Sequence, residues 1–275
     1  MSAVGKQQEK GSAFRAMHAG DPFVIPNPWD VGSARILEAL GFTALATTSS
    51  GFAFTLGLVD GRVTLDQMVQ HVAAVDAATD LPVSADLENG YGPDPADAAE
   101  AIQRVASAGA VGGSIEDFDR ESQELYEIEH AVDRIRAAVE AAHGVAFPFT
   151  LTARAENHIR DNPDIADTTR RLLAFAEAGA DVLYAPGLGT IEEIRTLCDA
   201  VSKPVNVLAV PGLSVAEIVD AGAQRISVGG SLTWVAIKAF ADAAGAIHDR
   251  GDVSALAARV PLDDWFGDRS VSPDP

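Results

Sequence analysis

Carboxylates follow two of the chain's apolar segments. Asp86 and Glu88 stand two residues apart in VSADLENGYG, and Glu116 ends the apolar part of GGSIED. If extended backbone continues beyond Asp86, the side chains of Asp86 and Glu88 point the same way. Carboxylates that converge there, with Asp60 as a further candidate, repel one another unless a cation or a proton shares the site. Oxygen ligands favour Mg²⁺ or Mn²⁺ over Zn²⁺, so these acids are candidate metal ligands, and helix or turn capping is the structural alternative.

Arg154 follows another apolar segment, in LTARAEN, two residues before Glu156. A guanidinium at this position either binds a substrate carboxylate in a fork or pairs with Glu116 or Glu156, and the two roles are compatible. Ser50 and Gly51 follow a further apolar segment, ALATTSSG, and their small size allows close approach to the backbone. Their amides are candidates for an oxyanion hole, and a simple glycine-containing loop is the alternative.

Other chemistries lack the residues that they need. A Schiff-base mechanism requires a lysine at the end of a strand, whereas the four lysines lie in a terminal segment, in a helical pattern or ahead of a strand. The six histidines include no H-x-H pair, which disfavours a histidine-bound zinc hydrolase. Cys198 is the single cysteine, so neither an internal disulfide nor a cysteine metal cage can form.

The elements that position these residues repeat one pattern, a helix-like run closed by glycine and followed by a short apolar stretch. The copies are EALGFTALATT, SAGAVGGSIED, EAGADVLYAP and DAGAQRISVGG. Glycine tolerates the left-handed conformation that ends a helix, so each copy predicts a helix end that leads directly into a buried strand. Extending the pattern predicts eight strands, near residues 23–26, 44–47, 83–86, 113–116, 149–153, 182–184, 205–208 and 225–228.

Helical patterns separate these strands, and several begin with a Ser or Thr cap and a Gln or Glu three residues later. The expected helices span residues 31–40, 65–78, 95–108, 128–142, 165–178, 191–201, 215–221 and 232–248. This alternation predicts a single-domain α/β fold, a closed parallel (β/α)8 TIM-type barrel rather than an open sheet. We expect the barrel at 13–250, a C-terminal helical arm at 251–267, and tails at 1–12 and 268–275.

The charge balance limits the partners of the protein. The 275 residues include 20 Lys and Arg against 40 Asp and Glu, a net charge of −20 that disfavours nucleic acid and anionic membranes. No apolar run reaches the length of a membrane span, about 18 residues, so we expect a cytoplasmic protein. Trp265 and Phe266 of the arm require burial, which predicts a homo-oligomer; folding back on the barrel's own helices is the alternative.

The chain resembles the isocitrate lyase and phosphoenolpyruvate (PEP) mutase superfamily nearly end to end, and most resembles its short phosphonomutase-like members. The matching stretches are NPWDVGSARILEALGFTALATTSSG, ADLENGYG, GGSIED, LTARAEN and PVNVLAVPGLSVAEIVDAGAQRISVGGS. The resemblance implies a Mg²⁺-dependent enzyme that handles the enolate of an α-oxo carboxylic acid and makes or breaks a C–C or P–C bond. It also implies a dimer or tetramer in which a late helix packs on a neighbouring subunit.

The resemblance assigns a role to each matching residue. It implies that Asp86 faces the metal, that Glu88 holds it through water, and that Glu116 lies near the metal or orders Arg154. Arg154 matches the arginine that binds the substrate carboxylate. The remaining matches are Ser50 and Gly51, whose amides receive the enolate oxygen, and the pocket positions Trp29, Asp60 and Asn206.

Two departures from the superfamily pattern affect the expected activity. Lyases of the superfamily carry a K-x-C-G-H loop after the fourth strand, whereas this chain has FDRESQELYEIEH, and Glu88 replaces an aspartate. We therefore expect a lyase or mutase for a small α-oxo or 2-hydroxy acid, with oxaloacetate-like decarboxylation or C–C cleavage ahead of phosphonate chemistry. The alternatives are a phosphonopyruvate-type P–C mutase or hydrolase, and a non-catalytic barrel that binds a small acid.

Overall fold

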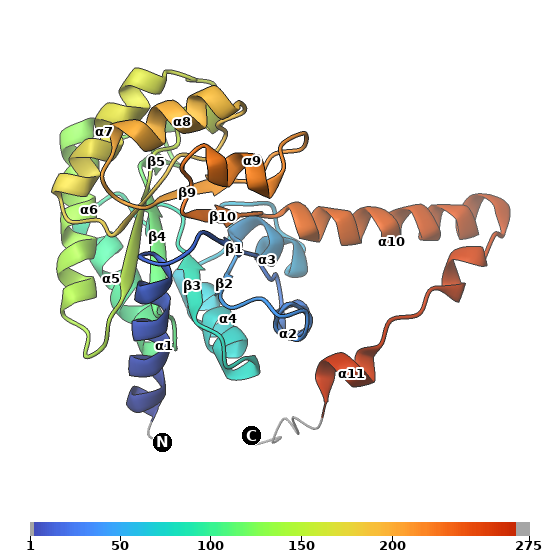
Figure 1. The fold of residues 1–275 in the computed structure, drawn as a ribbon. Coiled ribbons are helices and arrows are strands. Elements are labelled where there is room, and N and C mark those ends of the chain that lie inside the picture. Colours follow the sequence, from blue (N-terminus) through green and yellow to red (C-terminus); the bar gives the residue numbers. More distant parts are fainter. Residues whose placement is uncertain (1–2, 268–275) are drawn as a thin grey trace.

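The strands of the computed structural model form a nearly closed parallel barrel (Figure 1). The structure describes residues 3–267, so the tail predicted at 268–275 lies outside the described residues. Eight strands of the described chain take part, and β1 meets β2 through the hydrogen bond from the Ala46 amide to the Pro26 carbonyl, 3.1 Å. The predicted (β/α)8 fold is confirmed. Around the ring the strands are β1 (Phe23–Ile25), β10 (Arg225–Ser227), β9 (Val205–Leu208), β8 (Val182–Tyr184), β7 (Thr150–Arg154), β4 (Gly112–Glu116), β3 (Val83–Asp86) and β2 (Leu45–Ala46).

Helices on the outside of the barrel connect successive strands, because a parallel connection has to return to the starting edge. Their start signals act as predicted: Thr64, Thr190 and Ser214 each accept the amide of the Gln or Glu three residues later, and that side chain bonds back to the cap. The helices of this layer are α2 (Val31–Ala39), α4 (Leu65–Ala78), α5 (Pro95–Ser107), α6 (Ile128–His143), α7 (Ile165–Glu177), α8 (Ile191–Ala200) and α9 (Val215–Asp220).

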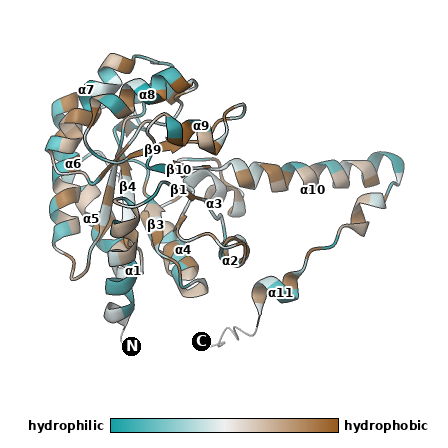
Figure 2. Ribbon diagram, in the orientation of Figure 1, coloured by the Kyte–Doolittle hydropathy of each residue, from teal (hydrophilic) through white to brown (hydrophobic). Residues whose placement is uncertain are grey.

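The hydrophobic core lies between the strands and the outer helices. Ile102 of α5, Phe149 ahead of β7 and Phe175 of α7 have almost no exposed surface there. Figure 2 shows hydrophobic and hydrophilic residues alternating along the outer helices, as expected for helices with one buried face. This packing makes the barrel wall a rigid support for the side chains at the strand ends.

The N-terminal segment differs from the tail predicted at 1–12. It forms helix α1 (Ala3–Met17), and Phe14 of this helix is completely buried. The buried ammonium of Lys10 lies 2.6 Å from an Asp76 carboxylate oxygen. A helix that buries a lysine in an ion pair lacks a clear apolar stripe, which is why the sequence pattern did not indicate it.

Helix α10 (Ser231–Arg250) also departs from expectation, because it extends away from the barrel instead of packing against it (Figure 1). Thr233 is the one residue of this helix that the described structure buries, whereas Val235 and Phe240 are 68% and 71% exposed. No helix among residues 3–267 has the length and apolar character needed to cross a membrane.

The chain returns from α10 through η2 (Ser254–Ala257) to α11 (Leu262–Phe266), which contacts α2. Arg35 of α2 donates to the Phe266 carbonyl and places its guanidinium carbon 4.8 Å from the centre of the Phe266 ring. Trp265 and Phe266 are therefore half-buried. Within a single chain the arm folds back on a barrel helix, as the alternative interpretation expected.

Short elements that the sequence pattern did not indicate lie at the carboxyl ends of the strands. Helix α3 (Ser49–Thr55) follows β2, and a hairpin of β5 (Phe118–Asp119) and β6 (Glu124–Leu125) follows β4. A 3-10 helix, η1 (Asn157–Arg160), follows β7. Chemistry in such barrels takes place at this end, so these elements frame the candidate site.

Candidate active site

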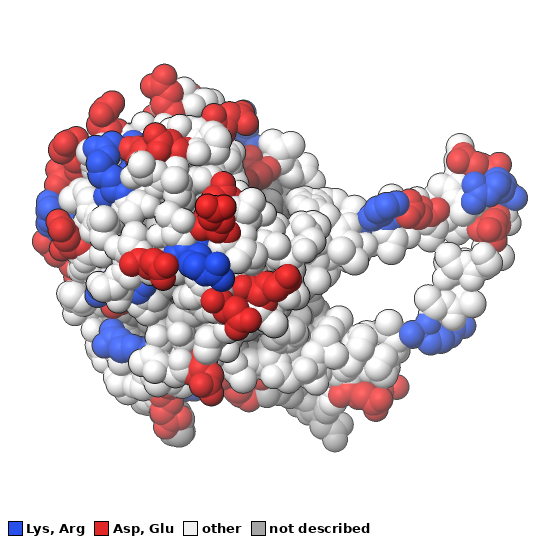
Figure 3. All heavy atoms as spheres, turned by 45° about the horizontal axis from the view of Figure 1, so that its top comes forward, with Lys and Arg blue, Asp and Glu red and all other residues white. Residues whose placement is uncertain are grey.

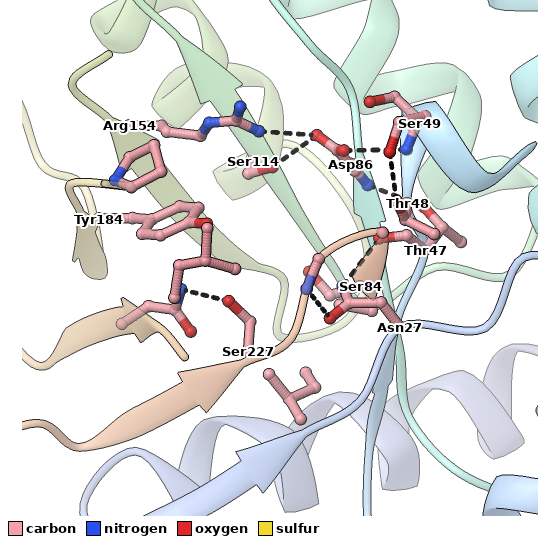
Figure 4. Close-up of a pocket in the computed structure, with 18 of the residues that line it drawn as sticks. Asn27, Thr47, Thr48, Ser49, Ser84, Asp86, Ser114, Arg154, Tyr184 and Ser227 are labelled. Atoms are coloured by element: carbon pink, nitrogen blue, oxygen red, sulfur yellow. Dashed lines mark hydrogen bonds and ion pairs between the residues drawn. The ribbon is translucent and has the colours of Figure 1, made fainter. Parts of the chain in front are cut away.

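A cavity of about 180 Å³ opens among the carboxyl ends of the strands and continues into the barrel (Figure 4). Ser49, Ser50, Asp60, Asp86 and Arg154 line its outer part. Its inner part is lined by residues of five strands, which include Ser84, Ser114, Tyr184, Asn206, Arg225 and Ser227. The cavity thus reaches residues that the sequence analysis placed at the mouth and others that it did not select.

Asp86 ends β3 and is held in place by neighbouring elements. Its Oδ2 accepts the Ser49 amide at 3.0 Å, and its Oδ1 accepts Arg154 Nη1 at 3.1 Å and Ser114 Oγ at 3.5 Å (Figure 4). Burial opposes ionisation of this carboxyl, but the charge of Arg154 and the Ser49 amide outweigh it, so the pKa of Asp86 lies below its usual value. Asp86 is therefore a fixed carboxylate at the cavity wall.

Arg154 joins three acids at the end of β7. Its nitrogens lie 3.1 Å from Asp86 Oδ1, 3.1 Å from Glu116 Oε2 and 2.5 Å from Glu156 Oε1. The ion pairs that were one predicted role of Arg154 are thus present. Because a guanidinium carries five N–H bonds, two remain after these contacts.

Glu88 does not lie beside Asp86 as extended backbone would place it. Strand β3 ends at Asp86, and Glu88 has a φ of 51°, so the alternation on which that expectation rested stops. Its Oε2 lies 2.8 Å from Arg120 Nε, and it lines a neighbouring cavity with Tyr91 and Arg120. Burial, with the charges of Asp86 and Asp60, raises the pKa of Glu88 to about 7 despite Arg120.

Arg120, on the turn of the β5–β6 hairpin, was not among the predicted site residues. Besides Glu88, its nitrogens lie 3.4 Å from Glu116 Oε1 and 3.7 Å from Asp60 Oδ2. It passes over Gly61, where the φ of 80° requires glycine and a Cβ would come within 2.3 Å of Arg120 Nη1. The segment FDRESQELYEIEH therefore places an arginine against the acids.

The acids of the mouth outnumber the arginines that pair with them. Fully ionised, the described carboxylates Asp60, Asp86, Glu88, Glu116 and Glu156 would give five negative charges against three positive ones from Arg120, Arg154 and Arg160, an excess of two that a proton or a cation has to balance. Glu88 Oε1 is buried without a hydrogen-bond donor, and the buried Glu116 oxygens have only their ion pairs with the arginines. Burial, with the charge of Glu156, raises the pKa of Glu116.

This excess fits a divalent cation, although residues 3–267 contain no cluster of three acids, histidines or cysteines that forms a ready metal cage. Mg²⁺ usually keeps several waters and is held by one or two carboxylates and by substrate oxygens. Asp86 at the cavity wall, with the buried carboxyl groups of Glu88 and Glu116 behind it, matches that mode of binding.

The structure distributes the remaining predicted residues between the cavity and its surroundings. Ser50, Asp60 and Asn206 line the cavity, whereas Gly51 and Trp29 do not. The Gly51 amide lies 3.4 Å from Thr48 Oγ1, which caps α3. Trp29 packs behind Gly51, where a Cβ on the glycine would come 3.0 Å from Trp29 Cβ.

Apart from Asn206, sequence reasoning missed the inner residues of the cavity. Tyr184 ends β8 and lies between Arg154 and Ser227 (Figure 4). Arg225 begins β10 and so stands at the opposite end of its strand from the mouth. Alternation along β8 and β10 is the signal that could have placed both side chains inside the barrel.

Comparison with known proteins identifies the family. Residues 14–248 match the family described as phosphoenolpyruvate phosphomutase. The chain belongs to this family. It is an enzyme of the isocitrate lyase and PEP mutase superfamily, as the resemblance in its motifs predicted.

Three similar proteins illustrate the range of this superfamily. A crystal structure of a putative lyase/mutase from Burkholderia cenocepacia J2315 is 47% identical, with a TM-score of 0.92, covering 95% of this chain and 97% of that one. The 2-methylisocitrate lyase of Escherichia coli K12 is 30% identical over 71% of this chain and 68% of its own length. An oxaloacetate decarboxylase of Pseudomonas putida GB-1 is 28% identical over 86% of this chain and 83% of its own length.

Proposed function

We propose that this enzyme is a Mg²⁺-dependent carbon–carbon lyase that acts on a small α-oxo or 2-hydroxy acid through an enolate, with decarboxylation of an oxaloacetate-like acid first among its reactions. The observation that carries this proposal is the pair of Asp86 and Arg154, which lie 3.1 Å apart on the wall of one cavity, in a mouth whose acids outnumber its arginines by two. The similar lyase and decarboxylase support a C–C bond as the target.

The metal site would be formed by Asp86, with Glu88 and Glu116 holding water around it, and Mn²⁺ is the alternative ion. When bound, the metal would act as a Lewis acid toward the oxo group of the substrate. Asp86 is suited to this role because its carboxyl stays ionised despite its burial. The Ser49 amide and Arg154 fix its orientation.

Arg154 would bind the substrate carboxylate with the two N–H bonds that its acid partners leave free. Glu116 and Glu156 hold the guanidinium in place, so the fork is oriented before the substrate arrives. The charge that develops on the enolate oxygen requires further donors. Ser50 is the better candidate, because its amide lies in the first turn of α3, whereas the Gly51 amide already faces Thr48.

The route of the proton favours decarboxylation. Cys198 lies on α8 and does not line the cavity, so no cysteine there can protonate a departing enolate among the described residues. The segment in place of the K-x-C-G-H loop carries Arg120, a cation rather than an acid at ordinary pH. After loss of CO₂ the enolate can be protonated by water, which needs no such acid.

The family match favours a second candidate, a phosphonopyruvate-type mutase or hydrolase. The two are separated by a panel of oxo acids assayed with Mg²⁺ and with EDTA. Pyruvate and CO₂ from oxaloacetate would support the lyase, and inorganic phosphate from phosphonopyruvate would support the second candidate. Binding of oxalate with no turnover across the panel would contradict both and leave a small-acid binding barrel.

We also propose that the enzyme is a cytoplasmic homo-oligomer, either a dimer or a tetramer, joined through α10. Trp234, Val235 and Phe240 are 47%, 68% and 71% exposed on this helix. Figure 3 shows charged side chains over the visible face of the barrel, whereas the base of the projecting helix is uncharged. Burial of each large apolar side chain would stabilise an assembly by about 1.5 to 3 kcal/mol, which a second copy of the chain can provide.

A further inference from the structure

The inner end of the cavity contains a buried arginine. Arg225 is 5% exposed, and its guanidinium donates to Asn206 Oδ1 at 2.8 Å and to Thr152 Oγ1 at 3.0 Å. A third contact joins Arg225 Nη1 to His18 Nε2 at 3.2 Å. Three of the five N–H bonds are thus engaged, and two remain on a side chain that lines the cavity.

No acid neutralises this guanidinium among the described residues, since none of their carboxylates lies within 4.0 Å of it. His18 is neutral in this arrangement: its Nδ1 donates to the Phe14 carbonyl at 2.8 Å, which leaves the Nε2 lone pair to accept Arg225. The three hydrogen-bond partners of Arg225 are therefore all uncharged. A buried cation without a counter-charge is costly. The chain has 40 Asp and Glu against 20 Lys and Arg, so the lack of an acid beside Arg225 does not reflect a shortage of acids.

The barrel interior next to Arg225 is hollow and polar. The inward positions there are Ala46, Ser84, Ser114, Asn206 and Ser227, which line the cavity, together with Thr152. Barrels of this kind usually fill such a layer with bulky branched side chains. The small hydroxyl and amide side chains leave room for a ligand and offer it hydrogen bonds.

The depth of this layer is set by the strands. Thr152, which contacts Arg225, lies two residues before Arg154 on β7, so both point into the barrel about 6.6 Å apart along the strand. A molecule held at Arg154 can therefore reach Arg225 with a short carbon chain. Tyr184 and Ser227 line the same cavity, and Figure 4 shows Tyr184 between Arg154 and Ser227.

We propose that Arg225 binds a second acidic group of the substrate at the inner end of the cavity, so that the enzyme selects diacids whose far carboxylate points into the barrel. This rests on the proposed function, because Arg154 and Asp86 are taken to hold the oxo-acid end. The far carboxylate supplies the counter-charge that the protein omits. Arg225 is thus a specificity residue that no motif of the sequence selected.

The test compares two ligands that differ only at the far end, 2-oxoglutarate and 2-oxopentanoate, titrated into the full-length protein with saturating Mg²⁺. The wild type should bind the diacid about tenfold or more tightly than the monoacid, as expected for a hydrogen-bonded ion pair. Arg225→Met should abolish that preference while the affinity for 2-oxopentanoate stays within about twofold. Arg136→Met, on the exposed face of α6, is the matched control and should change neither affinity.

A second variant keeps the inference testable if Arg225→Met does not fold. Thr152→Val keeps the arginine and nearly the shape of the inner layer but removes one hydroxyl that orients the guanidinium, so it should weaken the diacid and spare the monoacid. Equal loss for both ligands in either variant, or a wild type without preference, would overturn the assignment. A wild type that binds neither ligand, nor oxalate, contradicts the proposed function itself; binding of 2-oxopentanoate alone contradicts only the diacid site.

Discussion

The barrel and helix α10, which follows its last strand, differ in how far their apolar residues are buried. The outer helices from α4 to α8 turn apolar faces to the strands, and their buried residues are nearly free of exposed surface. Helix α10 is longer than any of them, at 20 residues, yet Thr233 is the only one of its residues that the described structure buries. The apolar faces of the outer helices are thus covered within one chain, whereas α10 carries apolar surface that a single chain leaves uncovered.

The two regions meet beside the candidate site. Trp234, in the first turn of α10, packs edge-on against Phe54 of α3 with ring centres 6.1 Å apart. Thr233 lies so close to Gly51 that a Cβ there would come within 2.6 Å of its Oγ1. The comparison therefore predicts that barrel residues control chemistry and α10 controls assembly, with contact between the two at α3.

The largest effect is expected from Asp86→Ala. Loss of the carboxylate at the cavity wall should remove Mg²⁺ dependence and lower kcat/KM about a thousandfold, while fold and assembly stay unchanged. Calorimetric titration with Mg²⁺ and size measurement by light scattering check both halves. Asp133→Ala, at an exposed pair on α6, serves as the control. Unchanged Mg²⁺ affinity in Asp86→Ala would contradict the metal assignment.

Assembly should respond to α10 and not to the arm. Phe240→Glu places a charge on the most exposed large apolar residue of α10, so it should weaken the oligomer by the burial energy of that ring, about 1.5 to 3 kcal/mol. Truncation after Val260 removes α11, which contacts the barrel's own α2, and should leave the oligomer intact. Light scattering at several concentrations measures both variants. A smaller species only after truncation would reverse these roles and show that the arm is exchanged.

Arg154→Lys tests the mouth at a smaller scale. Lysine keeps the charge but loses the fork that joins Asp86, Glu116 and Glu156, so KM should rise about tenfold, with a smaller fall in kcat. Arg170→Lys, at an exposed pair on α7, is the control. Kinetics indifferent to the change at Arg154 would mean that its ion pairs only support the fold.

The alternation of strands and helices could be predicted because its signals are local. A glycine that closes a helix and an apolar run after it occupy adjacent positions, as in DAGAQRISVGG, so neither needs tertiary information. The direction of α10 does not follow from its residue pattern, since an apolar helix face can pack against its own barrel or against another chain. Helix α1 was missed because Lys10 is buried in an ion pair.

The residues of the candidate site also divide into those with a local sequence signal and those that depend on the folded structure. Asp86, Asp60 and Asn206 were found at strand ends or in motifs and line the cavity. The turn at Glu88 was missed, since its φ of 51° is a non-glycine exception that residue type does not reveal. Arg225 was missed because its missing counter-charge is a property of the folded neighbourhood, which sequence spacing does not describe.

The last effect concerns acid stability and should belong to the barrel alone. Burial, followed by the charge of Arg225, lowers the pKa of His18 from 6.5 to about 3. As the pH falls from 6.5 toward 3, His18 therefore becomes protonated in the unfolded chain but stays neutral in the folded chain. The free energy of unfolding should decrease by about 1.4 kcal/mol for each pH unit in that range. Urea unfolding of wild type and His18→Gln isolates this slope, because the variant lacks the titrating ring.

His143→Gln, on the exposed end of α6, should keep the wild-type slope, and so should truncation after Val260. Equal slopes for wild type and His18→Gln would mean that the ring is protonated in the folded barrel, and would place a second positive charge beside Arg225.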